Sequence, residues 1–533
     1  MLKTGKLVSS KQMIQFNYLR KNRFNFLIVT LILIFIFIKV YSIHFNYSYP
    51  MHLDEYHHIA QSVQIIEEKG FVSTNPYFAE PIRHEDLEPG FHILLSELFL
   101  LTGIDPVKHY GFLPAFFACL SAFMLFVFVN KITGNFWTGI FAMLFFASLK
   151  SSVNILGINF LTPLTACIPL VYLFLLMFIE ALSDIDLRKL LISIILSAIL
   201  VLIYPLCGTL IMPVAFLYLL FNPKTMKGFY LKIINSFAME KLKANRLFYA
   251  KTTVLIIGIG MFIIIVSLYF WNYILLLSNK TNIINLLIFR EGWGKVEIKY
   301  FIPYLYGITA TVLASIGIIV SFKQKKYRMI AFFVFIMLVL ISMFNKYKFT
   351  VLSPYQRTLY FTMLTLVPLS AIGLTFILGY LNKLIKICLQ KNVAQKIIIT
   401  VFVVIIFISV FSDNYSLIDE KKIYRSVIIN EEDYKTIKWL EKNYGSYNTV
   451  LAPAFISSTI YPISKNYVVS ILSGQLGGGN LNATISFFKV VCNEKKKIIE
   501  ENGVNLVFSR ERIDCSGLKE VYNNKNFIYE VLI

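Results

Sequence analysis

Charged residues are scarce in this sequence. Asp, Glu, Lys and Arg make up 15% of its 533 residues, whereas soluble chains contain about 25%. Hydrophobic residues make up 57% and aromatic residues 16%. This composition excludes a soluble enzyme and indicates a polytopic membrane protein.

Acidic residues are especially few. The 30 Asp and Glu residues are outnumbered by 51 Lys and Arg, which gives a net charge of +21. A surface that binds nucleic acid needs its basic residues in one continuous patch. Here hydrophobic runs divide the basic residues into short blocks. The sequence therefore predicts no nucleic-acid partner.

Cysteine is also rare, since the chain contains six, too few for a disulfide scaffold. Four of them lie within apolar runs: Cys119, Cys167, Cys207 and Cys388. Only Cys492 and Cys515 lie in a polar part of the chain, where a disulfide could form.

Long apolar runs are what the sequence has in abundance. A membrane-spanning helix needs about 20 mostly apolar residues. About eleven runs approach that length, near 26–43, 110–130, 134–149, 160–182, 188–205, 206–222, 252–277, 301–322, 329–344, 358–380 and 397–411. The first run is too long for a cleaved signal peptide and lacks a small-residue cleavage site, so we expect it to remain as an anchor.

The positions of Lys and Arg predict the orientation. Basic blocks occur at the N-terminus and in the loops 223–251, 323–328 and 381–396, and such blocks stay in the cytoplasm. All four basic blocks lie on the same side of the membrane if the run at 91–101 is an interfacial helix that does not cross the membrane. We therefore expect a multi-pass protein of the cell membrane with a cytoplasmic N-terminus. The loop 44–108 and the tail 412–533 then face outward.

Two features of the segments assigned outside agree with this orientation. Loop 44–108 carries ten acids and three bases, the reverse of the cytoplasmic loops. Four Asn-x-Ser/Thr sequons, at Asn46, Asn279, Asn414 and Asn482, also fall in outer segments, although sequons are common by chance.

The tail 412–533 has the composition of a soluble domain, with 15 Lys and Arg and 14 Asp and Glu. The pattern predicts an amphipathic helix at 431–444, a strand at 449–452, a helix at 495–501 and strands at 504–509 and 527–532. We therefore expect two domains, a transmembrane domain at 1–411 and an external α/β domain at 412–533. The Gly-rich stretch 474–479 lacks the Lys-Ser/Thr of a phosphate loop and is interpreted as a turn.

The first outer loop opens with an amphipathic helix. Apolar residues recur at 53, 56, 59, 60, 63 and 66, which leaves Asp54, His58 and Gln61 together on another face. Asp54 at the start of such a helix stays ionised and can accept a proton or hold a divalent metal. Alternatively, Asp54 and Glu55 only cap the helix. His57 and His58 are either ligands or acid–base groups, or simply hydrogen-bonded side chains.

Other residues in this loop add metal-binding atoms. The run 83–86, Arg-His-Glu-Asp, supplies further oxygen and imidazole groups. The loop contains no fixed zinc-binding spacing.

The order of these features resembles the GT-C superfamily of membrane glycosyltransferases, which use polyprenyl-linked sugar donors. The resemblance covers nearly the whole chain and is nearest to the catalytic subunit of oligosaccharyltransferase and to protein mannosyltransferase-like enzymes. The segments that carry it are HLDEYHHIA with Asp54 and Glu55, Glu88-Pro89-Gly90-Phe91-His92, Phe289-Arg290-Glu291, Ser353-Pro354-Tyr355-Gln356-Arg357, and the tail segments at 430–440 and 450–453.

The resemblance implies a role for each matched residue. Asp54 would act as general base or would bind a divalent metal, Mg²⁺ or Mn²⁺, and Glu291 would face the acceptor and metal. Glu55, His57 and His58 would help to position the acceptor. Arg357 matches the external arginine that holds the lipid phosphate in this family. Arg290 and Lys150 would bind the donor phosphate as well, not by resemblance but because they are fixed cations at predicted outer ends of spans, where they match phosphate oxygens. Alternatively, these three cations snorkel or form salt bridges.

Two departures from the family pattern concern the acceptor and the metal. The sequon-reading signature of two tryptophans, Asp, Tyr and Gly would fall near 452–456 and is absent. The acidic pair expected near 150–160 is replaced by a segment without a carboxylate.

The sequence thus predicts an integral-membrane glycosyltransferase that transfers a sugar from a polyprenyl phosphate or diphosphate. Its partners would be this donor, a glycan, lipid or protein acceptor on the outer face, and membrane lipids. A lipid or polysaccharide transporter or flippase is the alternative, although we find no internal repeat and the acids cluster in a loop. A scaffold that presents the tail is a third interpretation, which leaves the acidic loop unexplained.

Overall fold

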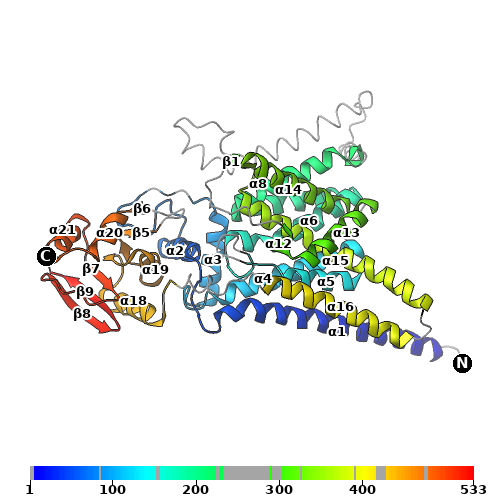
Figure 1. The fold of residues 1–533 in the computed structure, drawn as a ribbon, viewed down its shortest axis with the longest axis horizontal. Coiled ribbons are helices and arrows are strands. Elements are labelled where there is room, and N and C mark those ends of the chain that lie inside the picture. Colours follow the sequence, from blue (N-terminus) through cyan, green and yellow to red (C-terminus); the bar gives the residue numbers. More distant parts are fainter. Residues whose placement is uncertain are drawn as a thin grey trace, which may run out of the picture.

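A computed structural model describes residues 5–82, 84, 86–151, 157–223, 225, 227–229, 231, 288–290, 302–324, 327–388, 392–415, 428–472 and 478–532. Most of the described chain is helical, and a small mixed sheet lies near the C-terminus (Figure 1). The expected span at 252–277 lies outside the described residues.

Helices occupy the other ten predicted apolar runs. Their bounds are α1 Gly5–Tyr41, α4 Phe112–Thr133, α5 Phe136–Ala147, α6 Pro163–Asp184, α7 Leu187–Ile203, α8 Pro205–Leu220, α12 Ile302–Tyr306, α13 Ile308–Lys323, α14 Arg328–Tyr347, α15 Tyr355–Cys388 and α16 Asn392–Tyr415. Within the described residues, six are long and apolar enough to cross a membrane, in α1, α4, α6, α14, α15 and α16. The chain is therefore a multi-pass membrane protein, as the composition predicts.

Several other helices of this bundle are short. The helix α5 has 12 residues, or about 18 Å at about 1.5 Å per residue. The helix α8 has 16 residues and is linked to α7 through Tyr204. Such lengths fall below the hydrocarbon thickness, so these helices depend on their neighbours for their place in the membrane.

Glycines allow the helices α13 and α15 to approach each other closely. A Cβ atom on Gly317 of α13 would collide with the backbone of Leu369, and one on Gly373 of α15 with the backbone of Leu313. Close backbone contact through small residues is typical of membrane helix pairs, where packing replaces the hydrophobic effect. This contact fixes α15, whose N-terminus contributes to the site described below.

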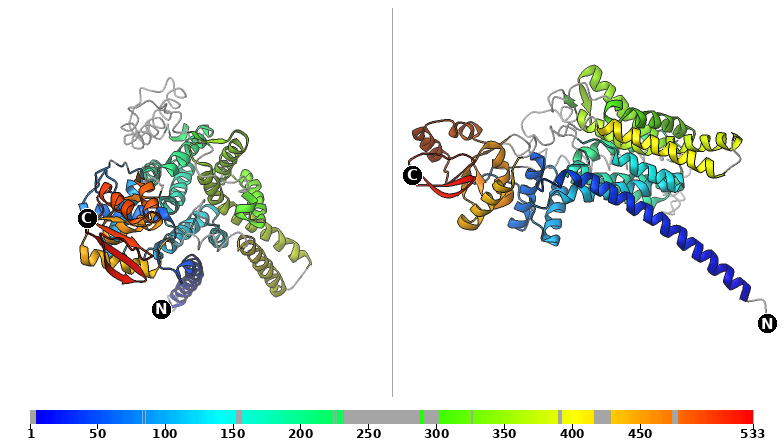
Figure 2. Two further views of the ribbon diagram at one scale, coloured as in Figure 1. Left: turned by 60° about the vertical axis from the view of Figure 1, so that its left-hand side comes forward. Right: turned by 60° about the horizontal axis from the view of Figure 1, so that its bottom comes forward.

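Two helices of the first loop lie between the bundle and the C-terminal region, α2 (Leu53–Glu68) and α3 (Pro89–Thr102) (Figures 1 and 2). A capping box starts α2, with His52 at the N-cap and Glu55 three residues on. Pro89 starts α3, and Gly103 ends it in the left-handed region at φ +63°. The helix α3 packs between α2 and α7, and Gly90 lies directly against the Leu202 backbone.

The C-terminal region, residues 428–532, forms a five-stranded sheet in the order β4-β3-β7-β9-β8. Strands β3, β4 and β7 are parallel, and β9 is antiparallel to β7 and β8. The strands are β3 Thr449–Leu451, β4 Tyr467–Val468, β7 Leu506–Ser509, β8 Leu518–Asn524 and β9 Asn526–Val531; Ser470–Ile471 (β5) and Gly478–Gly479 (β6) form a separate pair. This sheet is part of the small α/β module that the sequence predicts.

Four helices accompany the sheet: α18 Glu431–Tyr444, α19 Ala454–Ser464, α20 Leu481–Phe487 and α21 Cys492–Glu501. The bounds of α18 coincide with the predicted amphipathic helix, because Asn430 and Asp433 form a capping box and Gly445 ends it. Cys492 and Cys515 form the disulfide that their polar surroundings suggested. The glycine-rich stretch is described only at Gly478 and Gly479, which form β6.

The first loop is bonded to the C-terminal region. Tyr77 donates to the Ser458 carbonyl at 2.8 Å, and Lys465 pairs with Glu67 at 2.7 Å. Tyr434 of α18 donates to Asp105 at 2.7 Å. These contacts hold α2, packed against α19, at the junction between the bundle and the C-terminal region.

Candidate active site

The sequence-predicted residues at the start of α2 meet residues from α3 and α15. Asp54 stands in the first turn of α2, with its side chain 44% exposed, and its carboxylate lies 3.4 Å from His52 Nδ1. The His52 ring accepts a hydrogen bond from the Asp54 backbone at 3.1 Å, so this turn is fixed in place. The Asp54 carboxylate is therefore held near the helix N-terminus and is accessible to a second molecule.

The neighbouring acid, Glu55, has the opposite environment. Its side chain is buried, and its two oxygens accept hydrogen bonds from the backbone of Met51, His52 and Leu161 at 2.9–3.0 Å. Burial raises the pKa of Glu55 to about 8, against the opposing effect of these three bonds. Glu55 therefore fastens the start of α2 to the segment before α6.

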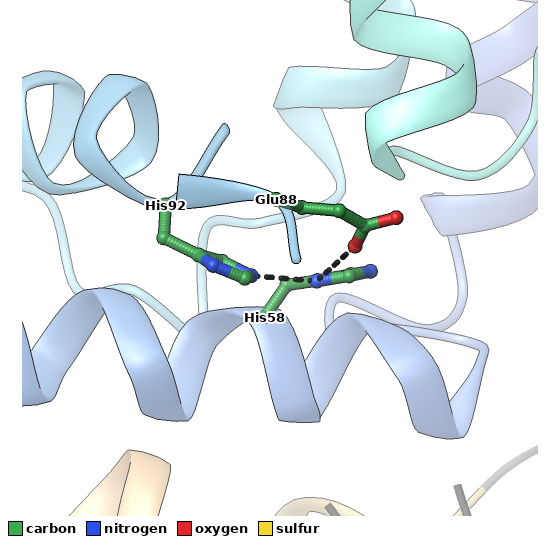
Figure 3. Close-up of side chains that lie close together, drawn as sticks. All are labelled: His58, Glu88 and His92. Atoms are coloured by element: carbon green, nitrogen blue, oxygen red, sulfur yellow. Dashed lines mark hydrogen bonds and ion pairs between the residues drawn. The ribbon is translucent and has the colours of Figure 1, made fainter. Parts of the chain in front are cut away.

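His58, Glu88 and His92 form a buried cluster between α2 and α3 (Figure 3). His58 Nδ1 lies 2.9 Å from His92 Nε2 and 3.9 Å from Glu88 Oε2. The Glu88 Oε2 atom is buried without a hydrogen-bond partner. Glu88 stands at the N-cap of α3 but makes no side-chain capping bond, so its carboxyl group is directed to the cluster.

Asp86 supports the cluster from the side. Its carboxylate lies 2.7 Å from His92 Nδ1 and accepts the Glu88 backbone N–H at 2.8 Å. Burial opposes ionisation of Asp86, but the charge and hydrogen bond of His92 still bring its pKa below the usual range. Burial, together with the negative charges of Asp86 and Asp54, raises the pKa of Glu88 well above its ordinary value.

The two histidines next to each other on α2 differ in their contacts. Burial lowers the pKa of both, that of His57 to about 4. His57 packs its ring edge against Tyr77 with the ring centroids 5.7 Å apart, and its Nε2 atom is buried without a hydrogen-bond partner. His57 thus packs against Tyr77, which is hydrogen-bonded to the C-terminal region, whereas His58 faces α3.

Arg357 lies in the first turn of α15. Its charge lowers the pKa of Glu88, and its side chain also interacts with Tyr204, which links α7 to α8. No acid occurs in this first helical turn. Arg357 therefore places a cation close to the α2–α3 cluster.

The chain just before α15 is strained. Leu352 adopts a left-handed backbone conformation at φ +71°, which is unfavourable for a branched side chain. Its carbonyl accepts a hydrogen bond from Thr209 at 3.0 Å, and Thr350 donates to the Ser353 carbonyl at 2.6 Å. These bonds hold the turn that brings Arg357 to the site.

The segment with Arg290 lies beside the same turn. Strand β1 (Ile288–Arg290) pairs with β2 (Phe349–Val351), so the Arg290 backbone is opposite Phe349. Glu291 and the Arg290 side chain lie outside the described part of the chain. The structure thus brings two separate segments of the family resemblance next to each other.

Lys150 follows α5 and is buried. Its ammonium donates to the Tyr304 carbonyl at 2.5 Å and lies 5.5 Å from the centre of the Tyr304 ring. These contacts connect Lys150 to α12, and not to the His58 cluster.

Sequence reasoning did not assign a role to Glu88, His92 or Asp86. They are in the loop already marked as rich in ligand atoms, and Glu88 and His92 are four residues apart around Pro89, which starts α3. That spacing places both on one side of the first helical turn. Their partner His58 lies 30 residues before Glu88 and 34 before His92, so only the packing of α3 on α2 brings the group together.

Comparison with known proteins identifies the fold. No protein-family model matches the chain, and no curated protein matches its sequence. Solved structures do match over most of its length, and the chain has their GT-C fold: a multi-span helical membrane domain with a small C-terminal mixed sheet.

Two solved proteins represent these similarities. The oligosaccharyltransferase of Archaeoglobus fulgidus, in the apo form, has a TM-score of 0.59 at 12% identity over 91% of this chain and 69% of that one. Its complex with zinc and sulfate has a TM-score of 0.56 at 14% identity over 90% and 67%. ArnT from Cupriavidus metallidurans, bound to undecaprenyl phosphate, has a TM-score of 0.53 at 11% identity over 94% and 97%. At these identities the similarity defines the fold.

Proposed function

We propose that this protein is a glycosyltransferase that transfers a sugar from a polyprenyl phosphate or diphosphate to an acceptor on the outer face of the membrane. The observation that carries the proposal is that an accessible carboxylate, Asp54, and a cation, Arg357, both lie near enough to Glu88 to affect its pKa, at one end of a GT-C bundle. Solved structures of this fold include complexes with dolichol phosphate and with undecaprenyl phosphate.

In this proposal Arg357 binds the donor phosphate. Its guanidinium group matches phosphate oxygens with paired hydrogen bonds. It stands in the first turn of the 34-residue helix α15, where the helix dipole also favours an anion. Arg290, on the neighbouring strand β1, and Lys150 are further candidates for this role.

Asp54 acts on the acceptor. An exposed carboxylate at a helix N-terminus can take the proton of an acceptor hydroxyl as the glycosidic bond forms. Glu55 positions this residue by fastening the first turn of α2. His57 and His58 lie on the same helix as Asp54 and are candidates for positioning the acceptor. Glu291 is assigned to the acceptor side by family resemblance alone.

The Mg²⁺ or Mn²⁺ that the resemblance implies fits the described residues poorly. These ions prefer several oxygen ligands, including carboxylates. The carboxylate of Glu55 is occupied by backbone N–H groups, and the segment 150–159 contains no carboxylate. Asp54 is not part of the cluster that could hold a metal within the described chain. We therefore derive no catalytic step through Mg²⁺ or Mn²⁺.

The acceptor is a glycan, a lipid or a protein. The segment 452–456, where the sequon-reading motif would fall, forms the turn from β3 into α19 and carries no Trp, Asp or Tyr. The deletion of the gene, followed by analysis of cellular glycans and glycolipids, would identify the product that loses a sugar.

Binding of undecaprenyl phosphate to the purified full chain tests the donor site. We expect Arg357→Ala to raise the Kd about tenfold to a hundredfold, as the loss of hydrogen bonds to a charged group does. Arg328→Ala is the matched control, because Arg328 is exposed at the start of α14 and bonded to the Phe322 carbonyl. Equal Kd values for the two variants would refute the phosphate role of Arg357.

The alternative function, a transporter or flippase of the same lipid, can be distinguished from a glycosyltransferase by what the protein produces. In reconstituted vesicles a flippase moves labelled undecaprenyl phosphate between leaflets without any transfer of sugar. Lipid movement that Asp54→Asn leaves intact, in a strain whose glycans do not change on deletion, would favour the transporter.

A further inference from the structure

The cluster of His58, Glu88 and His92 has the composition of a transition-metal site. Within the described residues, one ligand atom from each lies within 4.8 Å of the other two, and all three side chains are buried. The atoms come from two helices, His58 from α2 and the others from the N-terminal end of α3. Figure 3 shows the two rings and the carboxylate turned toward one another.

Residues next to the cluster orient its ligand atoms. The Asp86 carboxylate accepts the Nδ1–H of His92 at 2.7 Å, so the Nε2 lone pair of His92 is directed at His58. A carboxylate behind a ligating histidine is the usual support of a metal-bound imidazole. Ser62 donates to the His92 carbonyl at 3.2 Å, and Ser96 donates to the Ser62 carbonyl at 2.9 Å, so hydrogen bonds join α2 to α3 at this level.

One carboxylate oxygen of the cluster lacks a hydrogen-bond partner. Glu88 Oε2 is buried and receives no hydrogen bond, although it lies 3.9 Å from His58 Nδ1. A buried polar atom without a partner destabilises the fold, and a bound cation would compensate for this cost.

We propose that His58 Nδ1, Glu88 Oε2 and His92 Nε2 bind a zinc ion that joins α2 to α3. Tetrahedral zinc with bonds of about 2.0–2.1 Å holds neighbouring ligand atoms about 3.3 Å apart. The observed 2.9 Å between the histidine nitrogens must widen slightly, and the 3.9 Å to Glu88 must shorten. The ion replaces the His58–His92 hydrogen bond: the Nδ1 proton of neutral His58 moves to its Nε2 atom, and the proton that Glu88 carries before the ion binds leaves to solvent.

The ligand set favours zinc over the ions that the family resemblance implies. Two imidazoles and one carboxylate suit zinc, with an open fourth position for water or substrate. Mg²⁺ and Mn²⁺ prefer oxygen atoms, which supply only one of the three ligands here. Zinc would also offset the negative charges of Glu88 and Asp86 close to Arg357. With those charges offset, the charge of Arg357 would attract an anionic group to this part of the molecule.

Metal content of the full chain tests the site. After removal of metals by a chelator and incubation with an equimolar mixture of Zn²⁺, Mg²⁺ and Mn²⁺, we expect the desalted protein to retain one zinc. His92→Ala and Glu88→Gln should lose it, and Asp86→Asn should weaken it about tenfold to a hundredfold. X-ray absorption should show two nitrogen ligands from imidazole. Absence of zinc from the unsubstituted protein, or retention of Mn²⁺ in its place, would overturn the proposal.

Matched variants separate a specific loss from misfolding. His109→Ala removes an exposed histidine just after the first loop, Glu97→Gln removes an exposed acid within it, and both should keep the zinc. Hydrogen exchange should become faster in α2 and α3 upon chelation, and remain unchanged in α18. These measurements require no sugar transfer, so the zinc site stands or falls independently of the proposed function. Loss of zinc in the control variants as well would point to a folding defect and refute the assigned ligands.

Discussion

Two regions of this protein each bury a carboxylate, but the two carboxylates differ in how completely they are hydrogen-bonded. In the C-terminal region, Asp433 is fully buried and accepts hydrogen bonds from Arg510 Nε at 3.0 Å, from Asn526 at 3.0 Å and from the Asn430 backbone at 2.8 Å. In the α2–α3 region, Glu88 is also buried, but its Oε2 atom has no hydrogen-bond partner. The first carboxylate is completely paired, and the second is not.

This difference separates structural from functional polar groups. A paired buried charge stabilises the fold when its partners are in place, whereas an incompletely paired one is a cost that selection tolerates where chemistry or binding needs it. His57, with its own partnerless Nε2 atom, lies in the same α2–α3 region. We therefore expect substitutions around α2 and α3 to affect function and those around Asp433 to affect stability.

The largest expected effect is the loss of sugar transfer when Asp54, in the α2–α3 region, is substituted. Asp54→Asn should lower sugar transfer about 10²-fold to 10⁴-fold, the usual contribution of a general base. Its stability should be unchanged, since the side chain is 44% exposed. Transfer is measured as recovery of the glycan or glycolipid that a deletion strain lacks. Glu97→Gln removes an exposed acid from α3 and serves as the control, and near-normal recovery with Asp54→Asn would contradict the assignment.

The second prediction compares the two buried carboxylates directly. Asp433→Asn leaves Arg510 without its anionic partner and should reduce the free energy of unfolding by about 3 kcal/mol. Glu88→Gln, in protein stripped of metal, should change it by less than about 1 kcal/mol, because no hydrogen bond to Oε2 is lost. Urea unfolding followed by tryptophan fluorescence measures both. Similar losses in the two variants would remove the distinction between the regions.

Much of the fold could be predicted from composition and periodicity. Ten apolar runs identify the positions of the bundle helices, and the capping residues Asn430 and Gly445 mark the ends of α18. Local signals suffice in these cases, because helix length, caps and apolar character are written in consecutive residues. The disulfide between Cys492 and Cys515 was predictable because the other cysteines lie in apolar runs.

The candidate site was predictable only in part. Asp54, His58 and Arg357 stand out by type and position, but the environments of Asp54 and Glu55 cannot be told apart in sequence. The separation of their roles depends on the Leu161 backbone, which reaches Glu55 from 106 residues away. Likewise, His92 meets His58 through the packing of two helices. Contacts of this kind follow from tertiary structure, which periodicity does not encode.

The last prediction concerns the pH dependence of stability at Glu55. Its pKa rises from an ordinary 4.5 to about 8 in the folded protein, so the folded state keeps a proton that the unfolded state releases. The stability that this proton contributes is complete below about pH 4.5 and is lost as the pH rises through about 8. The slope is at most about 1.4 kcal/mol per pH unit. Glu55→Gln should flatten the curve in this window, whereas Glu68→Gln, at the exposed end of α2, should not. An unchanged slope in Glu55→Gln would show that Glu55 is ionised in the folded protein, held by its three backbone hydrogen bonds as firmly as Asp433 is held by Arg510.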